Sequence, residues 1–213
     1  MKDFEISVQR FDQFAAEYAQ RFMDLSAYMD SIGHFCNLVG KSQPAILKLA
    51  CAPGNVTRIR KQRFPESQIT AIDLAPNMLE IARKQLPDVD FRLMDVRNVS
   101  AIPEKFDAIM CSFCLPFLSK ADAKQLIADS FDRLTFEGVV YISTMEGTMD
   151  QAGFEATSFS GNSKVYFNYH LKHDLEAALK NIGFEIRQIK LQDYFEPNGL
   201  VFKDMIFIGV KKN

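Results

Sequence analysis

The feature that most constrains this 213-residue chain is the segment 45–55, where an apolar run breaks into small residues just before a helix-like stretch. The run Ala-Ile-Leu-Lys-Leu predicts a strand, and the following Ala-Cys-Ala-Pro-Gly predicts a tight turn with little side-chain bulk. A ligand can approach such a turn closely, and the N–H groups that open the next helix then face it. The segment therefore predicts a strand–turn–helix unit with a binding site at its turn.

Two aspartates follow at similar intervals, and each closes a strand-like run. Asp73 ends the run 69–73, and Asp95 ends the run 91–95. An acidic residue about 20 positions beyond a glycine turn is placed to accept hydrogen bonds from ribose hydroxyls. Because the turn lacks the G-x-G-x-x-G spacing that a pyrophosphate requires, the ligand need not carry phosphate. A strand-end aspartate often only caps the next helix, so a purely structural role of Asp73 and Asp95 also stays open.

Strand-like and helix-like segments alternate along most of the chain, which predicts a parallel sheet covered by helices on both faces. Helical periodicity over residues 9–39 predicts two N-terminal helices. Apolar residues in 174–182 form one helical stripe that Gly183 ends, and Pro76 suits the first turn of a helix. The predicted strands are 45–50, 69–73, 91–95, 108–112 and 139–144, followed by a hairpin of 184–192 and 200–211.

The composition of the strands predicts their places in the sheet. Strands around Ile46, Ile109, Val140 and Ile206 are almost continuously apolar, as expected when both faces are covered. In contrast, the third and sixth strands alternate apolar and polar residues, which is typical of sheet edges.

In order and spacing, these segments resemble the class I S-adenosylmethionine-dependent methyltransferases over nearly the whole length. Leu47–Gly54 is similar to the family's first motif, L-D-L-G-C-G-P-G, and Ala71–Met78 to its second. Asp95-Val96 resembles its adenine-binding turn, Phe106–Ser112 its fourth strand, and Leu179–Phe184 its last helix-to-strand turn. The resemblance implies an α/β fold: a doubly wound, mostly parallel seven-stranded sheet of order 3-2-1-4-5-7-6, strand 7 antiparallel, with an N-terminal helical cap. It also implies S-adenosylmethionine as the cofactor.

Site residues follow from the same resemblance. The first turn would contact the methionine part, Asp73 the ribose, and Asp95 the adenine amine, while apolar side chains would sandwich the adenine ring and the end of strand four would lie below the sulfonium. The cofactor-binding residues so implied are Tyr18, Ala50, Cys51, Ala52, Asn55, Asp73, Leu74, Met78, Asp95, Val96, Cys111 and Ser112.

Three positions depart from the family pattern. Lys48 stands where the family has an acidic residue, and Ala50 and Ala52 replace its two glycines. An ammonium about 5 Å from the cationic end of the ligand would cost roughly 3 kcal/mol at an effective dielectric near 20. Lys48 either points into the site at that cost or extends outward to solvent at little cost.

The sequence identifies no catalytic residue, since methyl transfer can rely on alignment and desolvation. If the acceptor is a hydroxyl or a neutral nitrogen, a base helps. The candidates near the long segment 146–170 are Glu146, Tyr166, Tyr169, His170 and His173. Pro116 occupies the loop in which some relatives carry a histidine.

The leading hypothesis is an enzyme that transfers a methyl group from S-adenosylmethionine to a small molecule. The alternatives are a non-catalytic module that binds the cofactor or a partner protein, and a nicotinamide oxidoreductase, against which the missing G-x-G-x-x-G counts. We expect one domain, divided into a cap (1–43), a cofactor-binding core (44–145), a lid or insert (146–170) and a C-terminal helix and hairpin (171–213). The segment 146–170 is a mobile segment or short hairpin over the cofactor, or only a surface excursion.

Composition indicates which partners and which cellular compartment suit the chain. A formal net charge of -2 and a basic cluster confined to residues 58–63 favour no nucleic-acid partner. No apolar stretch approaches the length of a membrane span, and the first residues do not resemble a signal peptide, so we expect a cytoplasmic protein. Four cysteines fit a reducing compartment. We interpret the C-x-x-C pair Cys111 and Cys114 as packing, and predict no metal site. The oligomeric state is not indicated.

Overall fold

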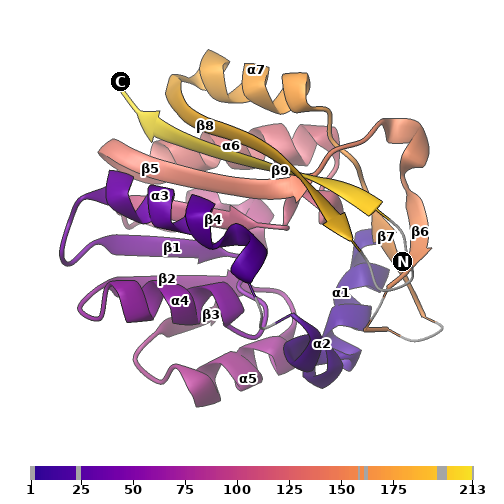
Figure 1. Cartoon of the computed structure of the whole chain (residues 1–213). Helices are drawn as coiled ribbons and strands as arrows, with labels where there is room; N and C mark the ends of the chain where they lie inside the picture. Colours follow the sequence, from indigo (N-terminus) through magenta and orange to yellow (C-terminus); the bar gives the residue numbers. More distant parts are fainter. Residues whose placement is uncertain (1–2, 23–24, 158, 161–162, 196–200, 213) are drawn as a thin grey trace.

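The computed structural model describes residues 3–22, 25–157, 159–160, 163–195 and 201–212 (Figure 1). The chain begins with helices α1 (Asp3–Gln13) and α2 (Ala15–Arg21), the 3-10 turn η1 (Ser26–Tyr28) and helix α3 (Met29–Val39). The first half of the sheet follows as β1 (Ala45–Leu49), α4 (Asn55–Arg63), β2 (Gln68–Asp73), α5 (Pro76–Gln85), β3 (Asp90–Leu93) and η2 (Val96–Ala101).

The second half begins with β4 (Phe106–Ser112), η3 (Leu115–Phe117), α6 (Lys120–Arg133) and β5 (Leu134–Met145). An excursion then contains η4 (Met149–Gln151), β6 (Gly153–Ala156) and β7 (Lys164–Phe167). The chain ends with α7 (Lys172–Ile182) and the long strands β8 (Phe184–Phe195) and β9 (Val201–Lys211).

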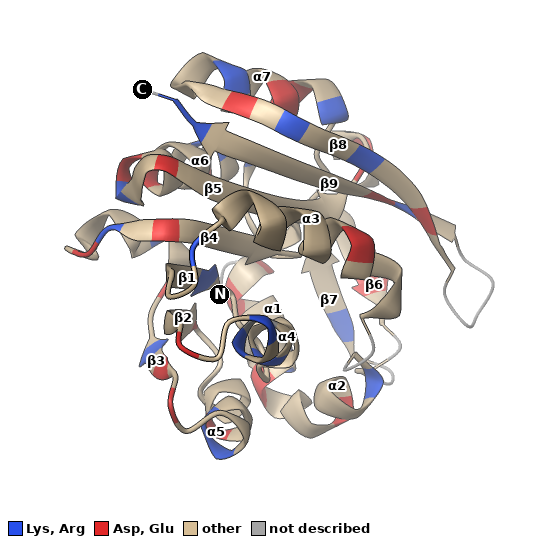
Figure 2. Cartoon of the chain, turned by 60° about the vertical axis from the view of Figure 1, so that its left-hand side comes forward, with Lys and Arg blue, Asp and Glu red and all other residues tan. Residues whose placement is uncertain are grey.

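Seven strands form the main sheet in the order β3-β2-β1-β4-β5-β9-β8. β1 to β5 are parallel, and β9 is antiparallel to both of its neighbours. This is the order expected from the sequence, with β9 as the seventh strand and β3 and β8 at the edges. Acidic and basic residues follow one another along β8 (Figure 2), which discourages pairing of this exposed edge with another chain.

Helices lie on both faces of the sheet (Figure 1), and one apolar layer on each face holds them there. On one face, Leu47, Leu49 and Ile109 share a buried cluster with apolar residues of α6 and α7. On the other face, Ile46 and Met110 share a cluster with residues of α3, α4 and α5. Neighbouring residues of β1 therefore pack in opposite layers, as the period of two of a strand requires.

Local signals place the helix ends. Pro76 is the first residue of α5, where its missing N–H has no intrahelical partner. Ser119 caps α6 by accepting a hydrogen bond from the backbone N–H of Asp122 at 3.1 Å. Gly183 ends α7 with a φ of 112°, a conformation that favours glycine.

The N-terminal region differs from the expectation of two helices, because the described residues before β1 form three α-helices. Phe14 separates α1 from α2 with a φ of -107° and a ψ of 30°, which is not helical. α3 packs against the sheet, where Phe35 contacts Tyr141 of β5 with ring centroids 5.7 Å apart. In the excursion, β6 and β7 form an antiparallel pair, so the hairpin alternative is confirmed there. The division of the chain into cap, core, lid and C-terminal part stays a prediction.

No helix within the described ranges has both the length and the apolar character needed to cross a bilayer.

Candidate functional site

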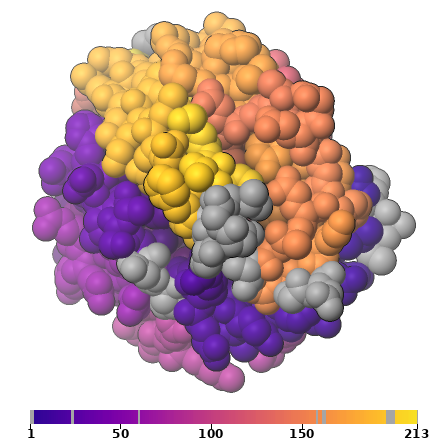
Figure 3. Space-filling model, turned by 45° about the vertical axis from the view of Figure 1, so that its right-hand side comes forward, coloured from indigo at the N-terminus to yellow at the C-terminus, as the bar shows by residue number. Residues whose placement is uncertain are grey.

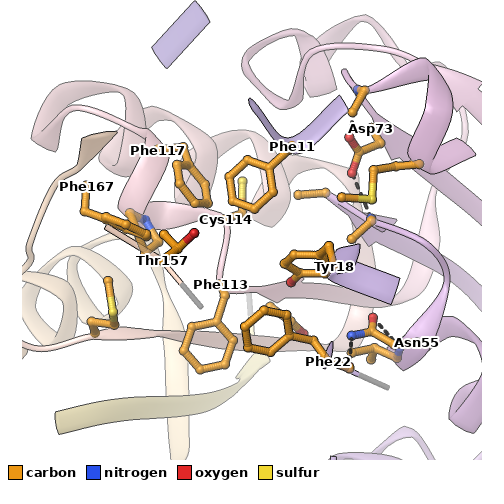
Figure 4. Close-up of a pocket in the computed structure, with 18 of the residues that line it drawn as sticks. Phe11, Tyr18, Phe22, Asn55, Asp73, Phe113, Cys114, Phe117, Thr157 and Phe167 are labelled. Carbon is orange, nitrogen blue, oxygen red and sulfur yellow. Dashed lines mark hydrogen bonds between the residues drawn. The ribbon is translucent and has the colours of Figure 1, made fainter. Parts of the chain in front are cut away.

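A cavity of about 520 Å³ lies at the carboxyl ends of the parallel strands (Figure 4). This volume is within the range of about 300–1,000 Å³ that is typical of ligand pockets. Its walls come from α1 and α2, from the turns after β1, β2, β3 and β4, from the β6–β7 excursion, and from the ends of β8 and β9. The cavity is therefore where open parallel sheets usually bind ligands.

Aromatic rings cover the cavity. Phe11 of α1 stacks on Phe159 of the excursion with centroids 5.1 Å apart, and packs edge-on against Phe117 at 4.9 Å. Tyr18 and Phe22 of α2 contact each other at 4.6 Å. Both segments that the sequence led us to expect as covers, the N-terminal helices and residues 146–170, thus line the cavity. Figure 3 shows the N-terminal, excursion and C-terminal segments on one face of the molecule.

Polar contacts fix α1 on both sides of the opening. The Ser7 hydroxyl accepts a hydrogen bond from the backbone N–H of Tyr166 at 2.9 Å, which attaches α1 to β7. On the other side, Asp12 accepts from the backbone N–H of Asn77 at 2.7 Å, which attaches it to α5. The cover is therefore held by specific contacts as well as by apolar packing.

The turn after β1 has an unusual backbone. Ala50 and Ala52 adopt left-handed φ values of 46° and 49°, and Gly54 has a φ of 90°. Left-handed geometry costs a non-glycine residue about 1–2 kcal/mol, because its Cβ crowds the following carbonyl oxygen. Two alanines therefore adopt a conformation here that glycine would adopt without this cost.

Asp73 connects this turn to the next helix. Its Oδ2 accepts a hydrogen bond from the N–H of Ala52 at 2.8 Å, and its Oδ1 accepts from the N–H of Ala75 at 2.9 Å. Burial raises the pKa of this carboxyl, and the backbone N–H groups oppose the rise. A carboxylate can accept about four hydrogen bonds, so it retains acceptor capacity toward the cavity that it lines. The capping and ligand-binding interpretations are compatible.

Asp95 lines the cavity beside Arg97. It caps η2 by accepting from the backbone N–H of Arg97 at 2.9 Å, and the guanidinium forms an ion pair with the same carboxylate. Burial alone would raise the pKa of Asp95, but the hydrogen bonds from Arg97 outweigh it and leave this pKa below its usual value. Arg97 also lies 3.9 Å from the ring centre of Phe4. An adenine amine would therefore share Asp95 with Arg97.

Lys48 is buried and bends over the end of its own strand. Its Nζ donates to the carbonyl oxygens of Leu49 at 2.6 Å and Ala50 at 3.0 Å, and only 2% of the residue is exposed. Burial lowers its pKa. Because the side chain lines the cavity, the alternative in which it extends outward to solvent is wrong.

Ten of the twelve predicted cofactor residues line this cavity, namely Tyr18, Ala50, Ala52, Asn55, Asp73, Leu74, Met78, Asp95, Val96 and Ser112. Cys51 and Cys111 do not belong to its lining. Cys111 lies in one apolar layer of the core and Cys51 in the other. Cys114 lines the cavity instead, and all four cysteines are free and buried.

None of the five candidate bases lines the cavity in the part of the chain that the structure describes. His170 is buried, and its Nε2 lies 2.9 Å from the carbonyl oxygen of Leu115; burial lowers its pKa. The hydroxyl of Tyr169 donates to Glu155 at 2.7 Å. These two contacts hold the excursion in place.

One polar pair that lines the cavity was not among the residues predicted from the sequence. The hydroxyl of Tyr28 in η1 donates to Oδ2 of Asp204 in β9 at 2.6 Å. One signal was available: Asp204 interrupts the last strand just before the continuously apolar run 205–208. Tyr28 gave none, because its partner is 176 residues away. In the described ranges, no group of three or more His, Cys, Asp and Glu side chains is arranged to hold a metal ion.

Comparison with known proteins places the chain among methyltransferases. Residues 46–138 match the model of a methyltransferase domain. A demethylmenaquinone methyltransferase of Thermotoga maritima is 34% identical over 94% of this chain and 96% of its own length. A malonyl-[acyl-carrier protein] O-methyltransferase of Bacillus anthracis is 29% identical over 67% of this chain, which spans only 51% of that protein.

Solved structures show the same fold. Magnesium protoporphyrin IX methyltransferase from Synechocystis, solved with bound S-adenosylmethionine, superposes with a TM-score of 0.72 over 100% of this chain and 98% of its own, at 14% identity. An S-adenosylmethionine-dependent methyltransferase from Clostridium acetobutylicum gives 0.71 over 95% of this chain and 99% of its own, at 17% identity. At these identities the likeness concerns the fold alone.

Proposed function

The chain belongs to the S-adenosylmethionine-dependent methyltransferases, and from this premise we propose that it methylates a small molecule held in the cavity at the carboxyl ends of its strands. The observation that carries the proposal is the covered, largely apolar cavity that ten predicted cofactor residues share with the cap and the excursion. An acceptor in such a space is enclosed on several sides, which suits a small molecule better than folded RNA. The relatives are named for different acceptors, so their names do not choose one.

The residues present fit the nucleoside end of the cofactor. Asp73 keeps acceptor capacity for ribose hydroxyls, and Leu74, Met78 and Val96 offer an apolar slot for adenine. At the methionine end, Lys48 would face the ammonium of the cofactor unfavourably and its carboxylate favourably. When bound, the cofactor supplies a methyl group on a sulfonium sulfur. We assign the nucleoside to the β1–β3 side of the cavity.

The protein's own contribution would be to align the acceptor and exclude water. Both reacting groups must be held in line at near-contact distance, which converts a bimolecular step into an intramolecular one. Phe11, Phe117 and Phe159 form the apolar cover that would remove water from that step. Because the nucleoside is assigned to the β1–β3 side of the cavity, the residues on the β4–β9 side would position the acceptor.

Calorimetry with S-adenosylhomocysteine, S-adenosylmethionine and NAD tests the proposal, followed by detection of S-adenosylhomocysteine release with a panel of small acceptors. We expect the first two ligands to bind and NAD not to bind. Binding without turnover on any acceptor would favour the non-catalytic module. No binding of either sulfur ligand would refute the function.

A further inference from the structure

Asp204 lies in the same cavity as the predicted cofactor residues but at its opposite end. It pairs with Met145 at the end of β5, and the sheet order places β9 two strands beyond β4. Since neighbouring strands are about 4.8 Å apart, Asp204 is about 10 Å across the sheet from the end of β4. The nucleoside assigned above occupies the β1–β3 side. Asp204 therefore faces the space left for the acceptor.

The carboxylate is held in a defined orientation. Asp204 is 2% exposed, and the Tyr28 hydroxyl donates a hydrogen bond to its Oδ2 at 2.6 Å. Tyr28 in turn packs edge-on against Phe113, with ring centroids 5.5 Å apart. Phe113 follows β4 and has a left-handed φ of 51°, an uncommon backbone conformation for a non-glycine residue. Because a carboxylate has about four acceptor positions, Asp204 can accept a further hydrogen bond from a ligand.

The surroundings of Asp204 raise its pKa toward neutral pH, which suits a general base. Burial raises the pKa of Asp204 to about 6, and the hydrogen bond from Tyr28 opposes the rise. The same burial and the nearby Asp204 charge raise the pKa of Tyr28, which keeps its proton on the phenol. Tyr141 of β5 and Tyr194 of β8 contribute further tyrosine hydroxyls to this neighbourhood. A carboxylate of raised pKa is a stronger proton acceptor than an ordinary one.

We propose that Asp204, oriented by Tyr28, is the general base of the reaction and accepts the proton of a hydroxyl group on an acceptor with an aromatic or otherwise apolar body. This inference rests on the proposed methyltransferase function and adds the acceptor class and a catalytic residue to it. The apolar body follows from the rings that line the acceptor side, Phe113, Phe117, Phe167 and Phe202.

The proposed step balances. The acceptor O–H bond breaks and its proton moves to Oδ1 of Asp204, while an oxygen lone pair forms the new O–C bond and the S–C bonding pair returns to sulfur. The sulfonium charge and the carboxylate charge both disappear, and the products are the methyl ether, the thioether and protonated Asp204. No oxidant or metal is required.

A hydroxyl suits this carboxylate better than an amine does. A buried carboxylate stabilises the protonated form of an amine, which has no lone pair to attack with. The same carboxylate draws the proton from a hydroxyl and increases the charge on its oxygen. The site would therefore oppose methylation of an amine and promote methylation of a hydroxyl.

The test uses 4-nitrophenol, whose phenolate is coloured, as a probe of the acceptor site in the full chain saturated with S-adenosylhomocysteine. Because an adjacent carboxylate disfavours the phenolate, we expect the apparent pKa of bound nitrophenol in the wild type to rise by about one unit. Asp204→Asn, which preserves shape and can still accept from Tyr28, should return it toward the free value. Tyr28→Phe should keep the rise.

Asp193→Asn provides the matched control, since Asp193 lies on the same hairpin, is half-exposed and pairs with Lys203. It should behave as wild type. The affinity for S-adenosylhomocysteine should change by less than about twofold in all three variants, while turnover of a hydroxyl acceptor falls about 10²-fold in Asp204→Asn. Failure of wild type to bind S-adenosylhomocysteine would instead count against the methyltransferase function itself.

Three results would overturn the assignment of Asp204 while leaving that function standing. These are no binding of nitrophenol to the saturated protein, equal probe ionisation in wild type and Asp204→Asn, and a methylated amine whose turnover is the same in both proteins. If Asp204→Asn does not fold, Tyr28→Phe and wild type still test the assignment. A carboxylate that faces the acceptor raises the pKa of bound nitrophenol in both proteins, whereas a merely structural carboxylate leaves that pKa unshifted in both.

Discussion

Replacing Asp204 by Asn should stabilise the fold above pH 6, although the residue lies in the candidate site. Asp204 is 2% exposed, and its pKa rises from 3.8 to about 6 because burial disfavours its charged form. Each pKa unit corresponds to about 1.36 kcal/mol, so the ionised carboxylate costs the folded state about 3 kcal/mol at neutral pH. Asn has nearly the same shape, can accept from Tyr28 and carries no charge.

The raised pKa of Asp204 makes the stability of the fold depend on pH. The folded state binds the Asp204 proton more tightly than the unfolded state does, so this residue reduces stability as pH rises from about 4 to about 6. Below that window wild type and Asp204→Asn should be equally stable. Above it the variant should be more stable by up to about 3 kcal/mol, which for a chain of this size is about 6 to 12 °C in the melting temperature.

Thermal or urea unfolding of both proteins at intervals between pH 4.5 and pH 8 measures this difference directly. Asp193→Asn serves as the control, because Asp193 is about half-exposed in an ion pair with Lys203 and should contribute little. A difference between wild type and Asp204→Asn that does not vary with pH, or a variant less stable at pH 8, would refute the reasoning. Such a result would mean that Asp204 is already well solvated or well paired.

Four further results are expected. Asp73→Asn should weaken S-adenosylhomocysteine binding by about 1.5–3 kcal/mol, the value of a charge-assisted hydrogen bond, and unchanged affinity by calorimetry would exclude the ribose assignment. Lys48→Met should tighten binding of S-adenosylhomocysteine by at most roughly 3 kcal/mol but leave 5'-methylthioadenosine, which lacks the amino-acid end, unaffected; weaker binding would mean that Lys48 holds the ligand's carboxylate. Ala52→Gly should raise the melting temperature by a few degrees because it relieves a left-handed alanine, whereas Ala71→Gly, in strand β2, should lower it. Amide exchange in residues 147–157 should be faster than in the sheet and should slow when S-adenosylhomocysteine binds; equal protection with and without ligand would contradict the lid.

The sheet was predictable because its signals are local and repeated. The apolar runs that contain Ile46 and Ile109 require cover on both faces, while β8 alternates along its length, and these two patterns alone separate central from edge strands. Asp73 was predictable for a similar reason, because its distance from the glycine turn fixes it at a neighbouring strand end. The number of N-terminal helices was not, since the break at Phe14 depends on how α1 and α2 pack over the cavity.

What the sequence did not reveal depends on contacts between distant residues. The pairing of Tyr28 with Asp204 joins two ends of the chain, and no periodicity brings them together. Whether Lys48 reaches solvent depends on the layer above it, and in this fold it finds carbonyl oxygens at 2.6 Å and 3.0 Å instead. Cys111 was misplaced for a simpler reason. A residue at a strand end lies near the cavity, but its side chain can still point into the core.

Most left-handed non-glycine residues of the described ranges lie at the carboxyl ends of the parallel strands, beside the cavity. Ala50, Ala52 and Phe113 adopt left-handed conformations there; a fourth non-glycine residue of this kind in the described ranges, Glu137, lies near the start of β5, away from the cavity. Strained backbone and buried charge persist where the surrounding structure fixes them, and they gather at functional sites. The Asp204 carboxylate belongs to this pattern, because an asparagine could accept the same hydrogen bond from Tyr28 without a buried charge. Three of the four left-handed non-glycine residues in the described ranges, and the buried Asp204 carboxylate, line the cavity. Selection for binding and catalysis explains this clustering better than selection for stability does.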